Sequence, residues 1–205
     1  ERERQILDGA IAFFAERGAS AKVDICPHAH PTQLRWRAEA GFVATDFETV
    51  LYQPLPAAGL APAAAGVDVR IAQSDEERAL WAELEARGFT EDHPTDDDYA
   101  LARAISLRAS AIPFLGFLDG EPAGTGMLNL VDTVAMFNGD STLPMARGRG
   151  VQSAILAERL RYAAQNGCDL GVIEATPGGT SQRNQLRAGF RIAYTRVCTE
   201  LPLKP

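Results

Sequence analysis

The chain has 205 residues, 46% of them hydrophobic and 23% charged, which is typical of a globular protein with one large domain, or with one domain and part of another. Its formal net charge of −7 at pH 7 argues against a general nucleic-acid binder. No apolar run is long enough to span a membrane and no signal-peptide pattern opens the chain. We therefore expect a cytoplasmic protein with neither a nucleic-acid partner nor a membrane partner.

A short segment near the N-terminus carries Cys26, His28 and His30, residue types that can bind metal. Two prolines interrupt the segment, and no second cluster of cysteine and histidine accompanies it. A turn is therefore the better interpretation. We expect no metal site, and we expect the three cysteines of the chain to be reduced thiols.

An uncharged segment rich in proline, alanine and glycine, residues 53–66, divides the sequence into two parts. Proline removes a backbone donor and glycine loosens the chain, so this composition predicts a linker with no regular element across it. We therefore expect one structural part at residues 1–52 and a larger domain at residues 67–205.

The larger part shows the patterns of a mixed α/β domain. Alternating apolar residues predict a strand at 67–71, and Ser74 with Glu77 forms a capping-box pattern for a helix that Gly88 can end. Asp119-Gly120 is a strong hairpin signal. The other predicted elements are a helix at 96–110, strands at 114–118, 123–131 and 134–143, a helix at 151–165, a strand at 170–175, a short helix at 181–187 and a strand at 192–201.

Arginines and glycines crowd the joint between the strand that ends near Leu143 and the helix that begins at Val151. Glycine lets the backbone approach a ligand, and the N–H groups of the first helical turn attract an anion. Arg147 and Arg149 can bind phosphate oxygens in a bidentate manner, so a pyrophosphate is the predicted ligand. A purely structural turn is the alternative interpretation.

This joint resembles the pyrophosphate-binding segment of the GNAT superfamily of acyl-CoA-dependent N-acyltransferases, written R/Q-x-x-G-x-G/A. Arg147 and Gly150 match this pattern, whereas Gln152 stands where the pattern has Gly or Ala. The order of the predicted elements also resembles the GNAT fold over residues 67–205. The resemblance implies an α/β fold of the mixed α+β type, with a central, mostly antiparallel, splayed sheet flanked by helices. It places the pantetheine arm of acetyl-CoA between the strands 134–143 and 170–175.

The resemblance also implies which residues contact acetyl-CoA. A backbone N–H near Leu143 is the expected donor to the thioester oxygen, where one such donor commonly lowers the barrier by about 3–4 kcal/mol. Asn184, at the start of the last helix, is expected to contact the pantetheine arm. The full set of expected cofactor-binding residues is Leu143, Arg147, Gly148, Arg149, Gly150, Val151, Gln152, Ser153 and Asn184.

Proton transfer is less clearly assigned. In much of the superfamily a tyrosine of the last helix protonates the thiolate, but the corresponding residue here is Gln185, which cannot act as an acid. Tyr194 is a candidate substitute, with a packed strand tyrosine as the alternative. Glu174 and Asp140 are candidate bases, because they are the carboxylates nearest to the splayed strands in the sequence. Structural roles for both carboxylates, and a water chain as the base, are the alternatives.

A faint internal repeat relates the two parts, because residues 24–51 align with residues 172–199 without a gap. Residues 1–52 therefore resemble the second half of another GNAT-type domain, in a tandem-like arrangement. This partial copy has no arginine-glycine motif and is expected to be non-catalytic. Chance similarity of strand-helix-strand patterning is the alternative. The sheet edge of the copy must be covered, and a partner subunit in a homo-oligomer is one candidate.

The leading hypothesis is that the protein is an enzyme, a GNAT-type N-acetyltransferase. It would move an acetyl group from acetyl-CoA to the primary amine of a small molecule by direct attack through a tetrahedral intermediate. A non-catalytic acyl-CoA-binding or regulatory module is the alternative, and a plain structural α/β domain is a third interpretation. The acceptor amine is expected near residues 88–112 and 132–140.

Overall fold

The computed structural model describes residues 2–60 and 62–203, which form two compact units. The first unit contains residues 2–51, 174–183 and 192–203, and the second contains the rest. This division differs from the expected boundary at the linker, because strand β8 (Arg191–Leu201) pairs with strand β1 (Ala21–Ile25). The antiparallel ladder between them joins the end of the chain to its beginning.

The first unit combines two helices with strands in the order β1-β8-β2. Its N-terminal elements show the predicted strand-helix-strand order, and the segment around His28 is a turn, as predicted. His30 caps α2, since its Nδ1 accepts a hydrogen bond from the N–H of Thr32 at 3.2 Å. The elements are α1 (Arg2–Ala15), β1, α2 (Pro31–Ala40), most of β2 (Val43–Pro54) and most of β8.

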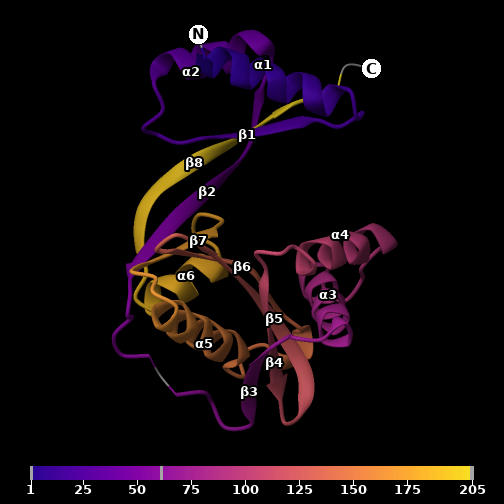
Figure 1. Ribbon diagram of the computed structural model, residues 1–205, viewed down its shortest axis with the longest axis vertical. Coiled ribbons are helices and arrows are strands. Elements are labelled where there is room, and N and C mark those ends of the chain that lie inside the picture. The colour runs from indigo at the N-terminus through magenta and orange to yellow at the C-terminus, as the bar shows by residue number, and fades with distance from the viewer. Residues whose placement is uncertain (1, 61, 204–205) are drawn as a thin grey trace. The chain divides into compact units, whose positions relative to one another are not determined.

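The second unit is a mixed sheet with the strand order β7-β6-β5-β4-β3. Three neighbouring pairs are antiparallel and the pair β6–β7 is parallel, so the predicted mostly antiparallel α/β sheet is confirmed. Helix α5 covers one face of this sheet, while α3 and α4 cover the other (Figure 1). The elements are β3 (Val67–Ile71), α3 (Asp75–Phe89), α4 (Asp96–Ser106), β4 (Ile112–Leu118), β5 (Glu121–Val131), β6 (Val134–Thr142), α5 (Val151–Gln165) and β7 (Leu170–Ala175).

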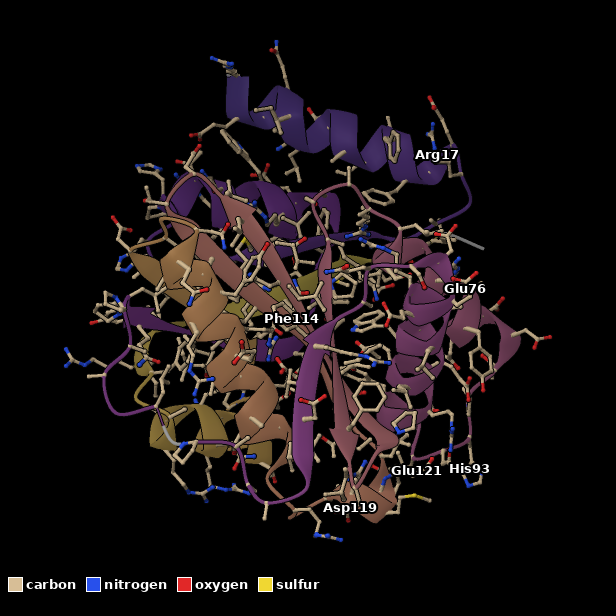
Figure 2. All side chains as sticks on the ribbon, turned by 60° about the horizontal axis from the view of Figure 1, so that its bottom comes forward. Arg17, Glu76, His93, Phe114, Asp119 and Glu121 are labelled. Atoms are coloured by element: carbon tan, nitrogen blue, oxygen red, sulfur yellow. The ribbon has the colours of Figure 1, made fainter. Side chains whose placement is uncertain are left out.

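The sequence predictions that rest on a helix N-cap and a tight turn are confirmed. Ser74 and Glu77 form the predicted capping box of α3, and Thr95 begins α4 with a second one. Asp119 and Gly120 both have positive φ, 53° and 87°, which is the geometry of the tight hairpin between β4 and β5. Figure 2 shows Asp119 and Glu121 at this hairpin, and Phe114 in the buried interior.

Helix α3 continues through Gly88 and ends at Phe89, so the predicted stop at Gly88 is wrong. Gly88 instead serves close packing, since a Cβ there would lie 2.6 Å from the Ser141 side chain on β6. Helix α4 is also shorter than predicted, ending at Ser106. The short helix near the C-terminus, α6 (Thr180–Arg187), agrees with the prediction.

Glycines on β4 and β5 bring α5 close to the sheet. A Cβ at Gly126 would lie 2.6 Å from Ile155 and 2.7 Å from the guanidinium carbon of Arg159, and Gly116 and Gly124 have similar neighbours on α5. Because strand residues alternate between the two faces, Thr125 points to the opposite face, towards α3. The other face packs around the fully buried Trp81, whose indole N–H donates to the carbonyl of Gly126 at 3.1 Å.

Among the described residues, no helix combines the length and the apolar character needed to cross a membrane.

Candidate cofactor cleft and acceptor pocket

The pairing of β6 with β7 is short, which opens the sheet at one end. The parallel ladder runs from Val134 and Leu170 to Phe137 and Ile173, although β6 continues to Thr142. Beyond Phe137 the register of β6 with β5 shifts, and Gly139 adopts a φ of +60°. Such a bulge redirects the strand and its side chains. The last part of β6 is therefore free of the parallel ladder, as the predicted splay requires.

A cleft of about 420 Å³ lies in the second unit beside this end of β6. It has a polar side at the start of α5 and an apolar side along that helix. Its lining includes part of the linker, Asp140 of β6, Ile173 of β7, and residues from both α5 and α6. Four of the residues expected to bind the cofactor line it, namely Gly150, Gln152, Ser153 and Asn184.

The N-terminus of α5 suits an anion. Gly150 is the N-cap with φ +85°, and no side chain caps the helix. The first intrahelical hydrogen bond joins the N–H of Ala154 to the carbonyl of Gly150 at 3.0 Å, so the N–H groups of residues 151–153 have no acceptor within the helix. A Cβ at Gly150 would lie 2.9 Å from that of Ala64, so glycine is required for space as well as for conformation.

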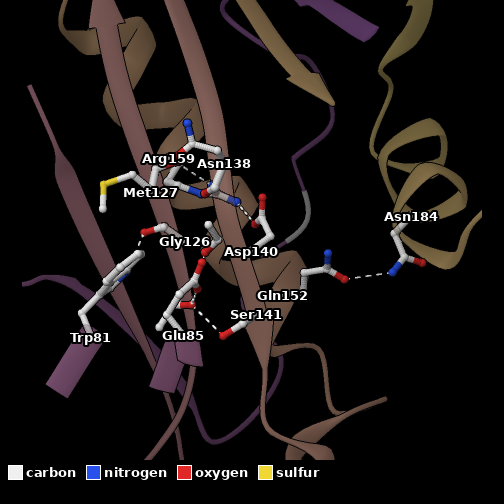
Figure 3. A network of polar contacts seen from close by, with 12 residues as sticks. Trp81, Glu85, Gly126, Met127, Asn138, Asp140, Ser141, Gln152, Arg159 and Asn184 are labelled. Atoms are coloured by element: carbon white, nitrogen blue, oxygen red, sulfur yellow. Dashed lines mark hydrogen bonds and ion pairs between the residues drawn. The ribbon is translucent and has the colours of Figure 1, made fainter. Parts of the chain in front are cut away.

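A polar pair joins this helix start to α6. The Nδ2 atom of Asn184 donates to Oε1 of Gln152 at 2.9 Å (Figure 3). Arg187 donates to Oδ1 of Asn184 at 2.7 Å. Gln152 stands where the family pattern prefers a small residue, and it uses its longer side chain to reach Asn184. The two amides bring hydrogen-bonding groups to the lining of the cleft.

The two arginines of the joint lie outside the cleft lining. Arg147 forms an ion pair with Glu91 at 2.7 Å, and that hydrogen bond raises the pKa of Arg147. Arg149 lies 3.3 Å from Asp119, and both pairs are well exposed. Exposed pairs of this kind are weak, so either arginine can exchange its partner for a phosphate at little cost.

The backbone of Leu143 does not offer the expected free donor. Its N–H donates to the carbonyl of Ala123 at 2.9 Å and continues the contact between the end of β6 and β5. An N–H engaged in this way cannot also hold a thioester oxygen without breaking the sheet hydrogen bond. Gly148 and Val151 also lie outside the cleft lining.

Asp140 lines the cleft but is paired. Its carboxylate accepts a hydrogen bond from Arg159, which is fully buried and also donates to the carbonyls of Met127 and Asn138 at 2.9 and 3.2 Å (Figure 3). Burial raises the pKa of Asp140, and the guanidinium of Arg159 opposes that effect. This arrangement favours a structural carboxylate.

Glu174 and Tyr194 belong to the first unit. Glu174 forms an ion pair with Arg196 at 2.8 Å, and Arg196 also contacts Asp24 and Glu48. Burial raises the pKa of Glu174, while Arg196 opposes the shift. The ring of Tyr194 packs edge-on against His28 with centroids 6.0 Å apart, and burial raises the pKa of its hydroxyl. These contacts account for both side chains without catalysis.

Sequence reasoning missed one carboxylate, Glu85 of α3. It is 9% exposed and accepts a hydrogen bond from the hydroxyl of Thr125, which also contacts Ser141 at 2.7 Å. Burial raises its pKa to about 7. A signal was available, because Glu85 follows Trp81 by four residues and therefore shares the buried face of the helix.

A smaller pocket of about 160 Å³ lies beside Glu85 in the second unit. It combines polar and apolar side chains, and it touches the bulge of β6 at Asn138 and Gly139. The predicted acceptor region, residues 88–112 and 132–140, supplies most of its lining. From that region come Ile105, Arg108, Ala111, Asn138 and Gly139, and the other lining residues are Glu85, Met127 and Asn129.

Comparison with known proteins gives a clear family match. The model of the acetyltransferase (GNAT) family matches residues 78–190, which is more than half of the chain. None of the curated protein sequences is significantly similar to this chain.

Solved structures show the same fold. A GCN5-related N-acetyltransferase from Kribbella flavida is 21% identical with a TM-score of 0.76, and the match covers 98% of this chain and 76% of the other. A tandem GNAT protein from the clavulanic acid biosynthesis pathway is 18% identical with a TM-score of 0.71, with coverages of 98% and 70%. The aminoglycoside N-acetyltransferase AAC(6')-Iy, solved in complex with CoA, is 24% identical with a TM-score of 0.50, with coverages of 64% and 92%.

Proposed function

Because the chain belongs to the GNAT acetyltransferase family, and is thus an acyltransferase, we propose that it transfers an acetyl group from acetyl-CoA to the primary amine of a small molecule. The family uses acetyl-CoA as the acetyl donor. The expected transfer is a direct attack by the neutral amine, which forms a tetrahedral intermediate before the thiolate departs.

The observation that carries this proposal is the cleft at the N-terminus of α5. It joins an uncapped helix start at Gly150 with the Gln152–Asn184 amide pair and the end of β6 that lies beyond the parallel ladder. An anion suits the uncapped helix start, and a polar amide chain suits the amide pair. The end of β6 is an exposed strand edge, which suits the thioester. Acetyl-CoA contains a pyrophosphate, an amide-bearing arm and a thioester in that order.

The hydrogen-bond donor to the oxyanion is then a backbone N–H of β6 instead of the N–H of Leu143. The candidates lie after Phe137, where the ladder to β7 has ended and the bulge turns the chain. A preorganised N–H of this kind needs no side chain and is invisible in the sequence.

Thermal unfolding with and without saturating acetyl-CoA tests the cofactor assignment, with free CoA as a second ligand. Ligand at 100 times its dissociation constant should stabilise the folded state by about 2.7 kcal/mol. An unchanged melting temperature at millimolar acetyl-CoA would contradict the proposal.

A pair of glycine variants locates the binding site. Gly150→Ala should weaken acetyl-CoA binding at least tenfold, which corresponds to about 1.4 kcal/mol. Gly167→Ala is the matched control, since Gly167 has nearly the same φ, +84°, at the other end of α5 with no atom near its Cβ position. Equal affinities in the two variants would show that the α5 start is structural. Arg147→Gln should weaken binding less, because its side chain must first leave Glu91.

Gln185 favours a second candidate function, a non-catalytic acyl-CoA-binding module. This side chain is 2% exposed, lines the cleft, and cannot serve as an acid towards a departing thiolate. A module of this kind would bind acetyl-CoA but release no thiol with any amine. Thiol release in the presence of acceptor amines therefore separates the two candidates.

A further inference from the structure

We propose that Glu85 is the catalytic base of this protein, and that the acceptor amine binds in the pocket beside it. The inference rests on the proposed transfer from acetyl-CoA and adds the residue and the pocket that handle the acceptor. The pocket lies on the α3 side of the second unit's sheet, whereas the cofactor cleft lies along α5. Both reach β6 at the bulge, the pocket at Gly139 and the cleft at Asp140.

The two oxygens of Glu85 have different surroundings. Oε2 accepts the hydrogen bond from Thr125, which fixes the carboxylate (Figure 3). Oε1 faces the bulge, since a Cβ at Gly139 would lie 3.2 Å from it. Glu85 and Gly139 both line the pocket, and Oε2 is the oxygen that holds the Thr125 hydrogen bond, so we assign Oε1 to the amine.

The pocket has the composition of a small-amine site. Ile105, Ala111 and Met127 provide apolar surface for a carbon chain. Asn129 and Asn138 can hold polar groups of the acceptor, while Glu85 is the carboxylate of the lining. A buried carboxylate in the lining of a partly apolar pocket favours a protonated primary amine as the ligand.

The charges around Glu85 leave it able to take up and release a proton. Asp140 of β6 disfavours its ionisation, and Arg159 of α5 favours it. The hydroxyls of Thr125 and Ser141 stabilise the ionised form. Arg108, which follows α4, is a further charged residue of the pocket lining. Burial outweighs these effects and raises the pKa of Glu85 to about 7. An efficient base has its pKa near the working pH.

The reaction balances with this single base. Glu85 takes one proton from the ammonium group, and the neutral nitrogen attacks the thioester carbon. The C–N bond forms, the C–S bond breaks, and the second proton lost by the nitrogen passes through solvent to the CoA sulfur. Glu85 then releases its proton to solvent, so the products are the acetamide, CoA thiol and one proton.

The test compares Glu85→Gln with Glu83→Gln. Both changes remove a carboxylate from α3, but Glu83 is half exposed and pairs only with Arg87 in the described contacts. Thiol release is followed with acetyl-CoA and butylamine, benzylamine or 1,4-diaminobutane between pH 5.5 and 9. We expect kcat of Glu85→Gln to fall about 100-fold or more, with acetyl-CoA affinity unchanged. The decline of kcat/KM below about pH 7 should disappear, and Glu83→Gln should match the parent protein.

Glu85→Asp keeps the carboxylate but withdraws it by one methylene. It should retain the acid limb of the pH profile with reduced kcat, which a purely structural role would not predict. Full activity and an unchanged pH profile in Glu85→Gln would overturn the assignment of the base while leaving the acetyltransferase proposal intact. The parent protein could bind acetyl-CoA yet release no thiol with any of these amines. That result would overturn the proposed acetyl transfer, and with it the assignment of Glu85 as the base. Absence of acetyl-CoA binding would overturn the cofactor assignment itself.

Discussion

Asp140 and Glu85 are both buried carboxylates of the second unit, yet their partners differ. Asp140 meets the guanidinium of Arg159, a full positive charge that is completely buried. Glu85 meets the hydroxyls around Thr125, which donate hydrogen bonds but carry no charge. A buried cation favours the ionised form of its partner carboxylate by its charge, whereas hydroxyls favour that form by hydrogen bonds alone. This difference in partners supports the proposal that Glu85, and not Asp140, is the base.

Removing Asp140 should have the largest effect on stability. Asp140→Ala leaves the Arg159 charge buried without its partner, which typically costs about 3–5 kcal/mol. Urea unfolding measures the loss. Glu91→Ala, which removes the exposed partner of Arg147, is the control and should leave the free energy of unfolding unchanged within error. Equal effects of the two variants would show that the Asp140–Arg159 pair does not stabilise the fold.

The pH dependence of the free energy of unfolding should reveal the ionisation of Glu85. The unfolded chain loses this proton near its ordinary pKa of 4.5, whereas the folded protein keeps it up to about pH 7. Glu85 therefore makes its full contribution to the free energy of unfolding below pH 4.5, and this contribution is lost as the pH rises towards 7. Glu85→Gln should remove this slope and be more stable than the parent protein above pH 7, by a few kcal/mol at most.

Urea unfolding measured from pH 4 to pH 8 gives the difference between the two proteins, which reports the titration of Glu85 together with its coupling to Asp140. A parent and a variant with parallel pH profiles would mean that Glu85 ionises normally in the folded state.

Thr125→Val tests the hydroxyl partner. Valine has a similar shape but cannot donate to Glu85, so the folded state should lose about 1–3 kcal/mol. Because the Thr125 hydrogen bond lowers the pKa of Glu85, its removal should move the inflection of the stability profile to higher pH. The same urea unfolding series, measured over pH, gives both the loss of stability and the position of the inflection. An inflection that does not move would show that Thr125 does not solvate the carboxylate.

The smallest expected effect comes from Ser74→Ala, which removes the N-cap of the helix that carries Glu85. Loss of such a cap costs about 1 kcal/mol. The inflection assigned to Glu85 should stay where it is, because the cap contacts neither the carboxylate nor its partners. A shifted inflection would indicate that any weakening of α3 disturbs Glu85.

Local sequence signals determined much of this fold. The Ser74 capping box, the Asp119-Gly120 hairpin and the uncapped start of α5 at Gly150 lie where the sequence predicts them. Each depends on residues within a few positions of one another, so backbone propensity and side-chain hydrogen bonding decide them without the rest of the chain.

Only the tertiary structure decided the chemistry around the bulge of β6. The hydrogen bond from Leu143 to Ala123, the partner of Arg147 and the buried pair of Asp140 each join residues far apart in the sequence. The pKa of Glu85 likewise depends on its burial, and on hydrogen bonds and charges from residues of β5, β6 and α5. Solvent exclusion and long-range pairing arise when strands and helices pack, and no single segment of the sequence carries that information.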